Sequence, residues 1–114
     1  MDRSAVDAQI AAVWRLESAR IVAALARMLR DLGEAEELAQ DALVSALERW
    51  PRDGLPERPA AWLMASARNA ALDRLRHRAM SARHHEALAA DDEALGRHVV
   101  PDVAEQVAEA QADD

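Results

Sequence analysis

The sequence predicts an all-α protein: a compact bundle of three main helices followed by an acidic, partly disordered or weakly helical tail. Apolar residues recur at three- and four-residue steps in three segments, the pattern of amphipathic helices. Alternating apolar and polar runs, typical of strands, are absent. Hydrophobic residues make up 51% of the chain, but many are alanine and the three aromatic residues are all tryptophan. We therefore expect a thin core of alanine and leucine, which suits closely packed helices.

The first helix is predicted over residues 5–30 and the second over residues 34–50. Gly33, between them, is expected to end the first helix in a left-handed cap. Pro51 is expected to end the second, because proline lacks the N–H that the helix needs. The apolar positions of the first helix are Ile10, Val13, Trp14, Ile21, Ala24, Leu25 and Met28, and those of the second are Leu38, Ala39, Ala42, Leu43, Ala46, Leu47 and Trp50.

Residues 51–58 hold two prolines and a glycine, which predicts a turn-rich loop. Pro59 suits the first position of the third helix, which is predicted to continue to His77 or Arg83. At 100° per residue this helix has two distinct faces. The apolar face consists of Met64, Ala65, Ala71, Leu72 and Leu75, and the polar face consists of Trp62, Ser66, Asn69, Asp73 and Arg76.

Charge divides the chain into a folded domain, residues 1–84, and an acidic tail or linker, residues 85–114. The formal net charge is −7. Residues 52–84 nevertheless carry seven arginines and three acidic residues, whereas residues 85–114 carry one arginine and nine acidic residues. A basic centre between acidic flanks leaves nucleic-acid binding open despite the negative total.

The composition argues against several other classes of function. The chain has no cysteine and no stretch apolar enough to span a membrane, and its first residues lack the apolar core of a signal peptide. We therefore expect a cytoplasmic protein with no membrane partner. It has no glycine-rich phosphate loop and no Ser/His/acid arrangement, so we expect no enzyme activity and no cofactor. His84 and His85 point about 100° apart on a helix, and Asp73 with His77 offers only two ligands, so no metal site is expected.

Two charged residues fall on apolar helix faces, Glu17 in the first helix and Arg68 in the third. Because an unpaired buried charge is strongly disfavoured, we expect them to meet each other, or each to meet another opposite charge. The alternative is that both long side chains reach water at the edge of the bundle.

Two motifs resemble region 2 of bacterial RNA polymerase sigma factors, most closely the extracytoplasmic-function group. They are Ala35-Glu-Glu-Leu-Ala-Gln-Asp-Ala-Leu-Val-Ser-Ala-Leu-Glu-Arg-Trp50 and Pro59-x-x-Trp-Leu-x-x-x-Ala-Arg-Asn-x-x-x-Asp-x-Leu-Arg76. The stretch from Val13 to Arg20 is similar to the subgroup that carries a C-terminal helical-repeat extension. Such factors also have a second domain that reads the −35 element, and we expect it to be absent from this chain.

The resemblance implies that the second helix binds the RNA polymerase core through the clamp helices of its β′ subunit. The outward residues assigned to that contact are Glu37, Gln40, Asp41, Val44, Ser45 and Glu48. An acidic strip of this kind is otherwise an ordinary solvated helix face.

The resemblance also implies recognition and melting of the −10 promoter element by capture of flipped non-template bases. The residues assigned to DNA are Arg52, Asp53, Leu55, Arg58, Trp62, Asn69, Asp73, Arg74, Arg76 and Arg78. An amide can read a base edge, an aromatic ring can stack on a base, and arginines can bind phosphates. Each also has an ordinary alternative: a core tryptophan, an Asn69–Asp73 contact, or solubilising surface arginines.

A rival function is an acidic helical module that binds another protein and never contacts DNA. The acidic tail and the total charge favour this rival, whereas the basic centre favours DNA. The promoter, the activating signal, the oligomeric state and any anti-sigma or regulatory partner are not specified by the sequence.

Overall fold

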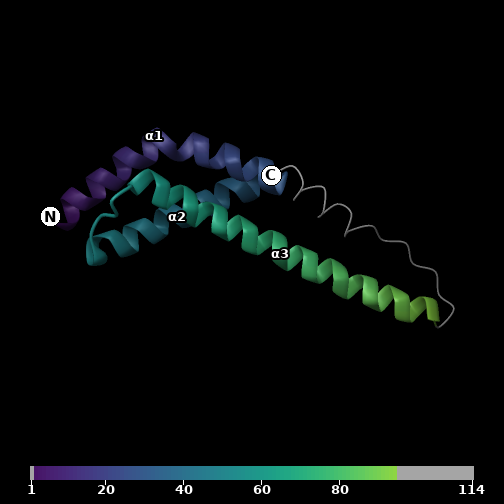
Figure 1. Ribbon diagram of the computed structural model, residues 1–114. Helices are drawn as coiled ribbons and strands as arrows, with labels where there is room; N and C mark the ends of the chain where they lie inside the picture. The colour runs from purple at the N-terminus through teal and green to yellow at the C-terminus, as the bar shows by residue number, and fades with distance from the viewer. Residues whose placement is uncertain (1, 95–114) are drawn as a thin grey trace.

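The computed structural model describes residues 2–94, which form three helices and no strand. Helix α1 spans Arg3–Leu29, α2 spans Leu32–Asp53 and α3 spans Pro59–Ala94. The helices pack against one another in all three pairings, and α3 extends well beyond the other two (Figure 1). The predicted all-α bundle is therefore confirmed.

The junction between α1 and α2 differs from the prediction at Gly33. The left-handed residue is Arg30, with φ of 57°, and its N–H donates to the carbonyl of Ala26 at 2.8 Å. Asp31 then caps α2, its Oδ1 accepting from the N–H of Glu34 at 2.9 Å. Gly33 consequently lies inside the first turn of α2. An acidic cap followed three residues later by glutamate is a known start signal, which the prediction overlooked.

The end of α2 also differs from the prediction, because Pro51 lies within the helix. Proline removes one intrahelical hydrogen bond but keeps a helical φ, so the last turn can continue to Asp53. The N–H of Gly54 still donates to the carbonyl of Trp50 at 2.9 Å. Gly54 then takes a φ of 96°, a conformation that favours glycine, and ends the helix.

Helix α3 begins at Pro59 as predicted but continues to Ala94, past the expected end at His77 or Arg83. Alanine, leucine and glutamate are good helix formers, and the chain has no glycine or proline between Pro59 and Gly96 to stop them. The expected domain boundary at residue 84 thus falls inside α3. The rest of the expected tail, residues 95–114, lies outside the described residues, as does His98.

The core is built from alanine and large aliphatic residues, as the composition predicts. Ile10, Ile21 and Leu25 of α1 are fully buried beside alanines of α2, such as Ala39 and Ala46. Helix α3 contributes Leu63, Ala67, Ala71 and Leu75, of which the first two were missing from the predicted apolar face. Ala65, predicted for that face, is exposed, because it lies beyond the edge of the buried stripe.

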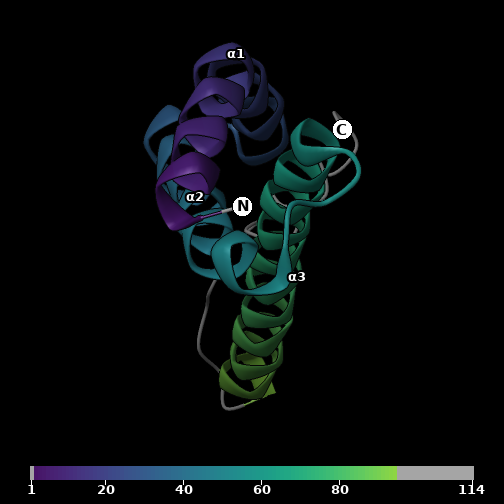
Figure 2. The same cartoon turned by 90° about the vertical axis from the view of Figure 1, so that its left-hand side faces the viewer.

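Helices α2 and α3 run antiparallel, so their ends meet in opposite order. Trp50, near the end of α2, contacts Trp62, near the start of α3, and Glu34 at the start of α2 contacts Arg78 farther along α3. Figure 2 shows the 54–58 segment joining the two helices at the tryptophan end. Within residues 2–94, no helix is both long and apolar enough to cross a membrane.

Candidate nucleic-acid interface

The two tryptophans fix the junction between α2 and α3. Trp50 is buried, and its ring lies edge-on to that of Trp62, with centroids 5.3 Å apart and planes at 74°. Trp62 is half-buried and packs against the core, yet part of its ring stays accessible. Trp62 was predicted to be either a core residue or an exposed aromatic residue. In the structure it is partly each.

A depression between α2 and α3 contains most of the predicted polar face of α3. Its lining residues are Arg49, Trp62, Ala65, Ser66, Asn69, Ala70 and Asp73. Asn69 and Asp73 are exposed, and Ser66 is half-buried. The fifth member of the predicted face, Arg76, lies one turn farther along and binds Asp73 at 3.1 Å.

Arg49 is a polar member of this depression that the sequence analysis did not select. It comes from the last turns of α2 and is exposed. Its position beside α3 depends on the antiparallel packing of the two helices, which places residue 49 opposite residues 62–66. The motif ending in Arg49-Trp50 contains the residue, but only the fold places it beside Trp62 and Asn69.

A second depression lies between α1 and the first turns of α3. Its lining residues are Glu17, Arg20, Arg58, Pro59, Ala60, Ala61, Met64, Ala65 and Arg68. Glu17 and Arg68 therefore reach the same hollow, as expected of two charges on facing helix edges. Glu17 forms an ion pair with Arg20 at 3.6 Å, one turn along α1, which agrees with the alternative that it meets another opposite charge.

The loop predicted over residues 51–58, which contains four of the residues assigned to DNA, is shorter in the structure. Arg52 and Asp53 belong to the last turn of α2 and pair with each other at 3.1 Å, both largely exposed. Leu55 is half-buried and packs against the core, which anchors the loop. Arg58 is exposed, and its carbonyl accepts a hydrogen bond from the N–H of Trp62 at 2.9 Å.

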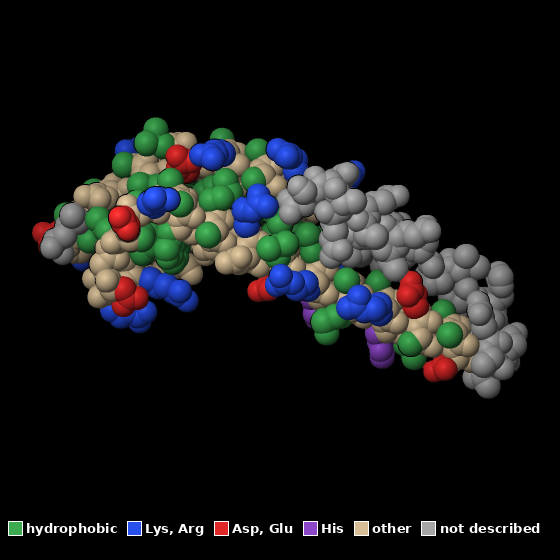
Figure 3. Space-filling model, in the orientation of Figure 1, with side chains coloured by type: hydrophobic (Ala, Val, Ile, Leu, Met, Phe, Trp, Pro, Cys, Tyr) green, Lys and Arg blue, Asp and Glu red, His purple; other side chains and the backbone are tan. Residues whose placement is uncertain are grey.

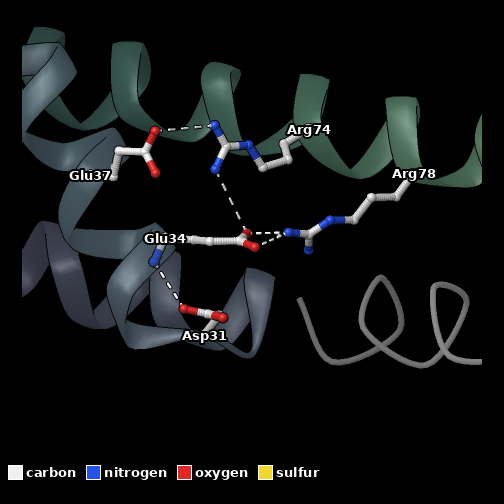
Figure 4. Close-up of polar contacts among 5 residues, drawn as sticks. All are labelled: Asp31, Glu34, Glu37, Arg74 and Arg78. Atoms are coloured by element: carbon white, nitrogen blue, oxygen red, sulfur yellow. Dashed lines mark hydrogen bonds and ion pairs between the residues drawn. The ribbon is translucent and has the colours of Figure 1, made fainter.

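Arg74 and Arg78, predicted to contact phosphates, point instead to acidic residues of α2 (Figure 4). Arg78 Nη2 donates to both carboxylate oxygens of Glu34. Arg74 lies 3.8 Å from Glu34 and 3.7 Å from Glu37. These four residues are named here the α2–α3 ion cluster, and all except Glu37 are partly buried. The cluster links two helices, and its members Glu34 and Arg78 are 44 residues apart in the chain.

The outer side of α2 presents the acidic strip assigned to polymerase. Glu37, Gln40, Asp41, Val44 and Glu48 are exposed, and Ser45 is half-buried. Gln40 also borders a third depression, between α1 and α2, whose other lining residues are Trp14, Ser18, Ala19, Val22, Ala23, Leu32 and Glu36.

Exposed apolar side chains accompany this strip. Val44 within the strip is 49% exposed, and Leu32, which lines the third depression together with Gln40, is 61% exposed. Leu32 was not among the residues predicted from the sequence. Apolar groups next to an acidic strip are typical of a surface that another protein covers.

The described residues thus offer cations, an aromatic ring and an amide around the start of α3. Figure 3 shows basic side chains over the bundle and farther out along α3, interspersed with acidic ones. Within residues 2–94, no three histidine or acidic side chains gather as a metal site would require.

Comparison with known proteins identifies the class to which this geometry belongs. Residues 14–80 match the family described as Sigma-70 region 2. The chain therefore belongs to the Sigma-70 region 2 family, whose members in general bind RNA polymerase and recognise the −10 promoter element.

A second comparison found a known protein that is similar to part of this chain. A stretch of 53 residues is 49% identical to an uncharacterized protein of Rhizobium meliloti (strain 1021), covering 46% of this chain and 12% of that protein. The chain thus spans a small part of that relative's length. No solved structure matches the chain.

Proposed function

We propose that this chain is the part of an extracytoplasmic-function sigma factor that binds the polymerase core and melts the −10 element. The family match supports the proposal most directly, because residues 14–80 include both α2 with its acidic strip and the first half of α3. Sigma factor domains are generally cytoplasmic, and we propose that location here. The subgroup with a C-terminal helical-repeat extension remains part of this proposal.

The outer strip of α2 is the proposed contact with the clamp helices of the β′ subunit. Asp41, Val44 and Glu48 are exposed, so a partner helix can reach them without rearranging the bundle. Carboxylates flanking an apolar residue suit a partner that carries arginine and leucine. Glu37 is less available to a partner, because it already pairs with Arg74.

The start of α3 is the proposed contact with the −10 element. Trp62 offers part of its ring from a fixed position, and Asn69 offers an amide two turns farther along the same depression. Extruding a base costs a few kcal/mol, which stacking and base-edge hydrogen bonds at such a site must offset. The fixed ring and the exposed amide are the groups available for this.

A binding assay with the β′ clamp helices tests the polymerase contact. The wild-type chain is expected to bind, and the double variant Asp41→Arg/Glu48→Arg is expected to lose at least about tenfold in affinity, because it reverses the charges that face the partner. Glu86→Arg on the exposed far part of α3 is the matched control and is expected to bind as wild type does. Absence of binding by the wild-type chain would contradict the proposal.

One observation favours the rival function, an acidic protein-interaction module. Arg74 and Arg78, two of the cations assigned to DNA, are neutralised by Glu34 and Glu37. The rival predicts no binding to single-stranded DNA at any salt concentration. The sigma proposal predicts binding that weakens as salt rises, since phosphate contacts release counterions.

A further inference from the structure

We propose that Arg20 of α1 and Arg49 of α2 contact the backbone phosphates of a single DNA strand that crosses the start of α3. This proposal rests on the proposed function and deepens it. The residues assigned to DNA from the sequence lie in the third helix and in the loop predicted before it. This proposal adds one contact from α1 and one from α2.

The two depressions beside α3 lie on either side of one ridge. Ala65 lines both of them, so the hollow that contains Arg20 and the hollow that contains Arg49 meet at this residue. Ala61 and Ala65 on the ridge are exposed and carry the smallest possible side chain apart from glycine. A strand crossing the ridge can therefore lie close to the helix and reach both hollows.

Each hollow carries cations suited to phosphate. The hollow beside α1 contains three arginines, namely Arg20, Arg58 and Arg68, against one acidic residue, Glu17. Arg20 is 75% exposed, and its contact with Glu17 is long, at 3.6 Å, so its guanidinium can turn to a phosphate at little cost. The hollow beside α2 contains Arg49, which is exposed and forms no ion pair with a described residue. It also contains one acidic residue, Asp73, which pairs with Arg76 at 3.1 Å.

The α2–α3 ion cluster contains two arginines that are less available to phosphate than Arg20 and Arg49. Arg74 and Arg78 already have carboxylate partners on α2, and releasing them would leave Glu34 without its own. Arg20 gives up a longer contact, 3.6 Å from Glu17, and Arg49 forms no ion pair with a described residue. Two cations in the middle of α3 are therefore held by α2, which leaves Arg20 and Arg49, around the start of α3, more readily available to DNA.

Single-stranded DNA is favoured over an acidic peptide because of Trp62. Its accessible ring lines the same hollow as Arg49 and Asn69, and a ring beside a cation and an amide can hold a base next to its phosphate. A carboxylate peptide would use the arginines but would gain nothing comparable from the ring.

The test uses the full chain and a fluorescein-labelled single-stranded oligonucleotide of mixed sequence, with anisotropy measured over a range of salt concentrations. Arg20→Ala and Arg49→Ala are each expected to weaken binding several-fold. Each should also lower the slope of log affinity against log salt by about 0.7, the value for one lost phosphate contact on a single strand. Arg15→Ala and Arg27→Ala, exposed on α1 and outside both hollows, are the matched controls and should change neither quantity.

Four results would overturn the proposal. Arg20→Ala and Arg49→Ala variants that bind with wild-type affinity and slope would overturn it while leaving the proposed function intact. Equal losses in the Arg15→Ala and Arg27→Ala controls would do the same, because the attraction would then be spread over the whole surface. A wild-type chain that binds no oligonucleotide, or that binds a polyglutamate peptide more tightly, would overturn both this proposal and the DNA part of the proposed function.

Discussion

At the scale of single residues, Trp50 combines deep burial with an unsatisfied donor. Its side chain is 2% exposed, and its indole N–H finds no hydrogen-bond partner among the described residues. A buried donor without a partner costs about 1–3 kcal/mol, whereas the apolar ring stabilises the core. The two contributions can be separated by substitution.

Replacing Trp50 by phenylalanine is expected to change the free energy of unfolding by less than about 1.5 kcal/mol, because the lost ring volume is offset by removal of the unsatisfied donor. Replacing it by alanine is expected to cost about 3–5 kcal/mol, because a large cavity remains. Urea denaturation followed by circular dichroism measures both. A Trp50→Phe variant as unstable as Trp50→Ala would contradict this account.

The candidate site could be predicted from the sequence only where it depends on a single helix. Trp62, Ser66, Asn69 and Asp73 share a depression, as the helical spacing indicates. The roles of Arg74 and Arg78 depend on Glu34, about 40 residues earlier in the chain, and no local pattern reveals that contact. Arg49 and Arg20 were overlooked for the same reason.

At the scale of elements, the α2–α3 ion cluster determines how the middle of α3 attaches to α2. Glu34 accepts from Arg78 through both carboxylate oxygens and also lies near Arg74, with side chains that are 25% to 34% exposed. Partial burial and a shared carboxylate make such a network stronger than an isolated surface pair.

A double-mutant cycle on Glu34→Ala and Arg78→Ala is expected to give a coupling free energy on the order of 1 kcal/mol in thermal or urea unfolding. The matched control is the Asp73–Arg76 pair, whose side chains are 76% and 68% exposed. Its cycle is expected to give about 0.3–0.5 kcal/mol, the usual value for a solvated pair on one helix. Equal couplings in the two cycles would show that the cluster adds nothing beyond surface charge.

The elements themselves were more predictable than their ends. Periodicity depends on packing of one helix face, so it predicted all three helices and most of the buried positions. Ends depend on individual residues: Asp31 starts α2 earlier than expected, and Pro51 is tolerated in its last turn. The far end of α3 was missed because helix propensity, rather than core packing, maintains it.

At the scale of the whole molecule, α3 has two unequal halves. Its first half, from Leu63 to Leu75, lies in the core, whereas residues 83–88 are all exposed. Helix stability in proteins comes mainly from packing, so the two halves should open at very different rates.

Hydrogen exchange of the full chain is expected to show strong protection of backbone amides between residues 63 and 75 and fast exchange between residues 84 and 91. The physical reason is that opening the first half requires unfolding the bundle, whereas the second half can fray by itself. Mass spectrometry of peptic fragments measures both segments in one experiment. Similar protection in the two segments would indicate that another surface covers the far half of α3.

The antiparallel pairing of α2 and α3 affects how much binding free energy is spent on ordering the protein when a ligand binds. The contact between Trp50 and Trp62 holds the two ends of segment 54–58 together, and the charged contacts at the other end of the pair fix α2 relative to α3. Folding has therefore already removed most of the conformational entropy of this region. A ligand that arrives here meets a preorganised surface and loses little affinity to ordering the protein.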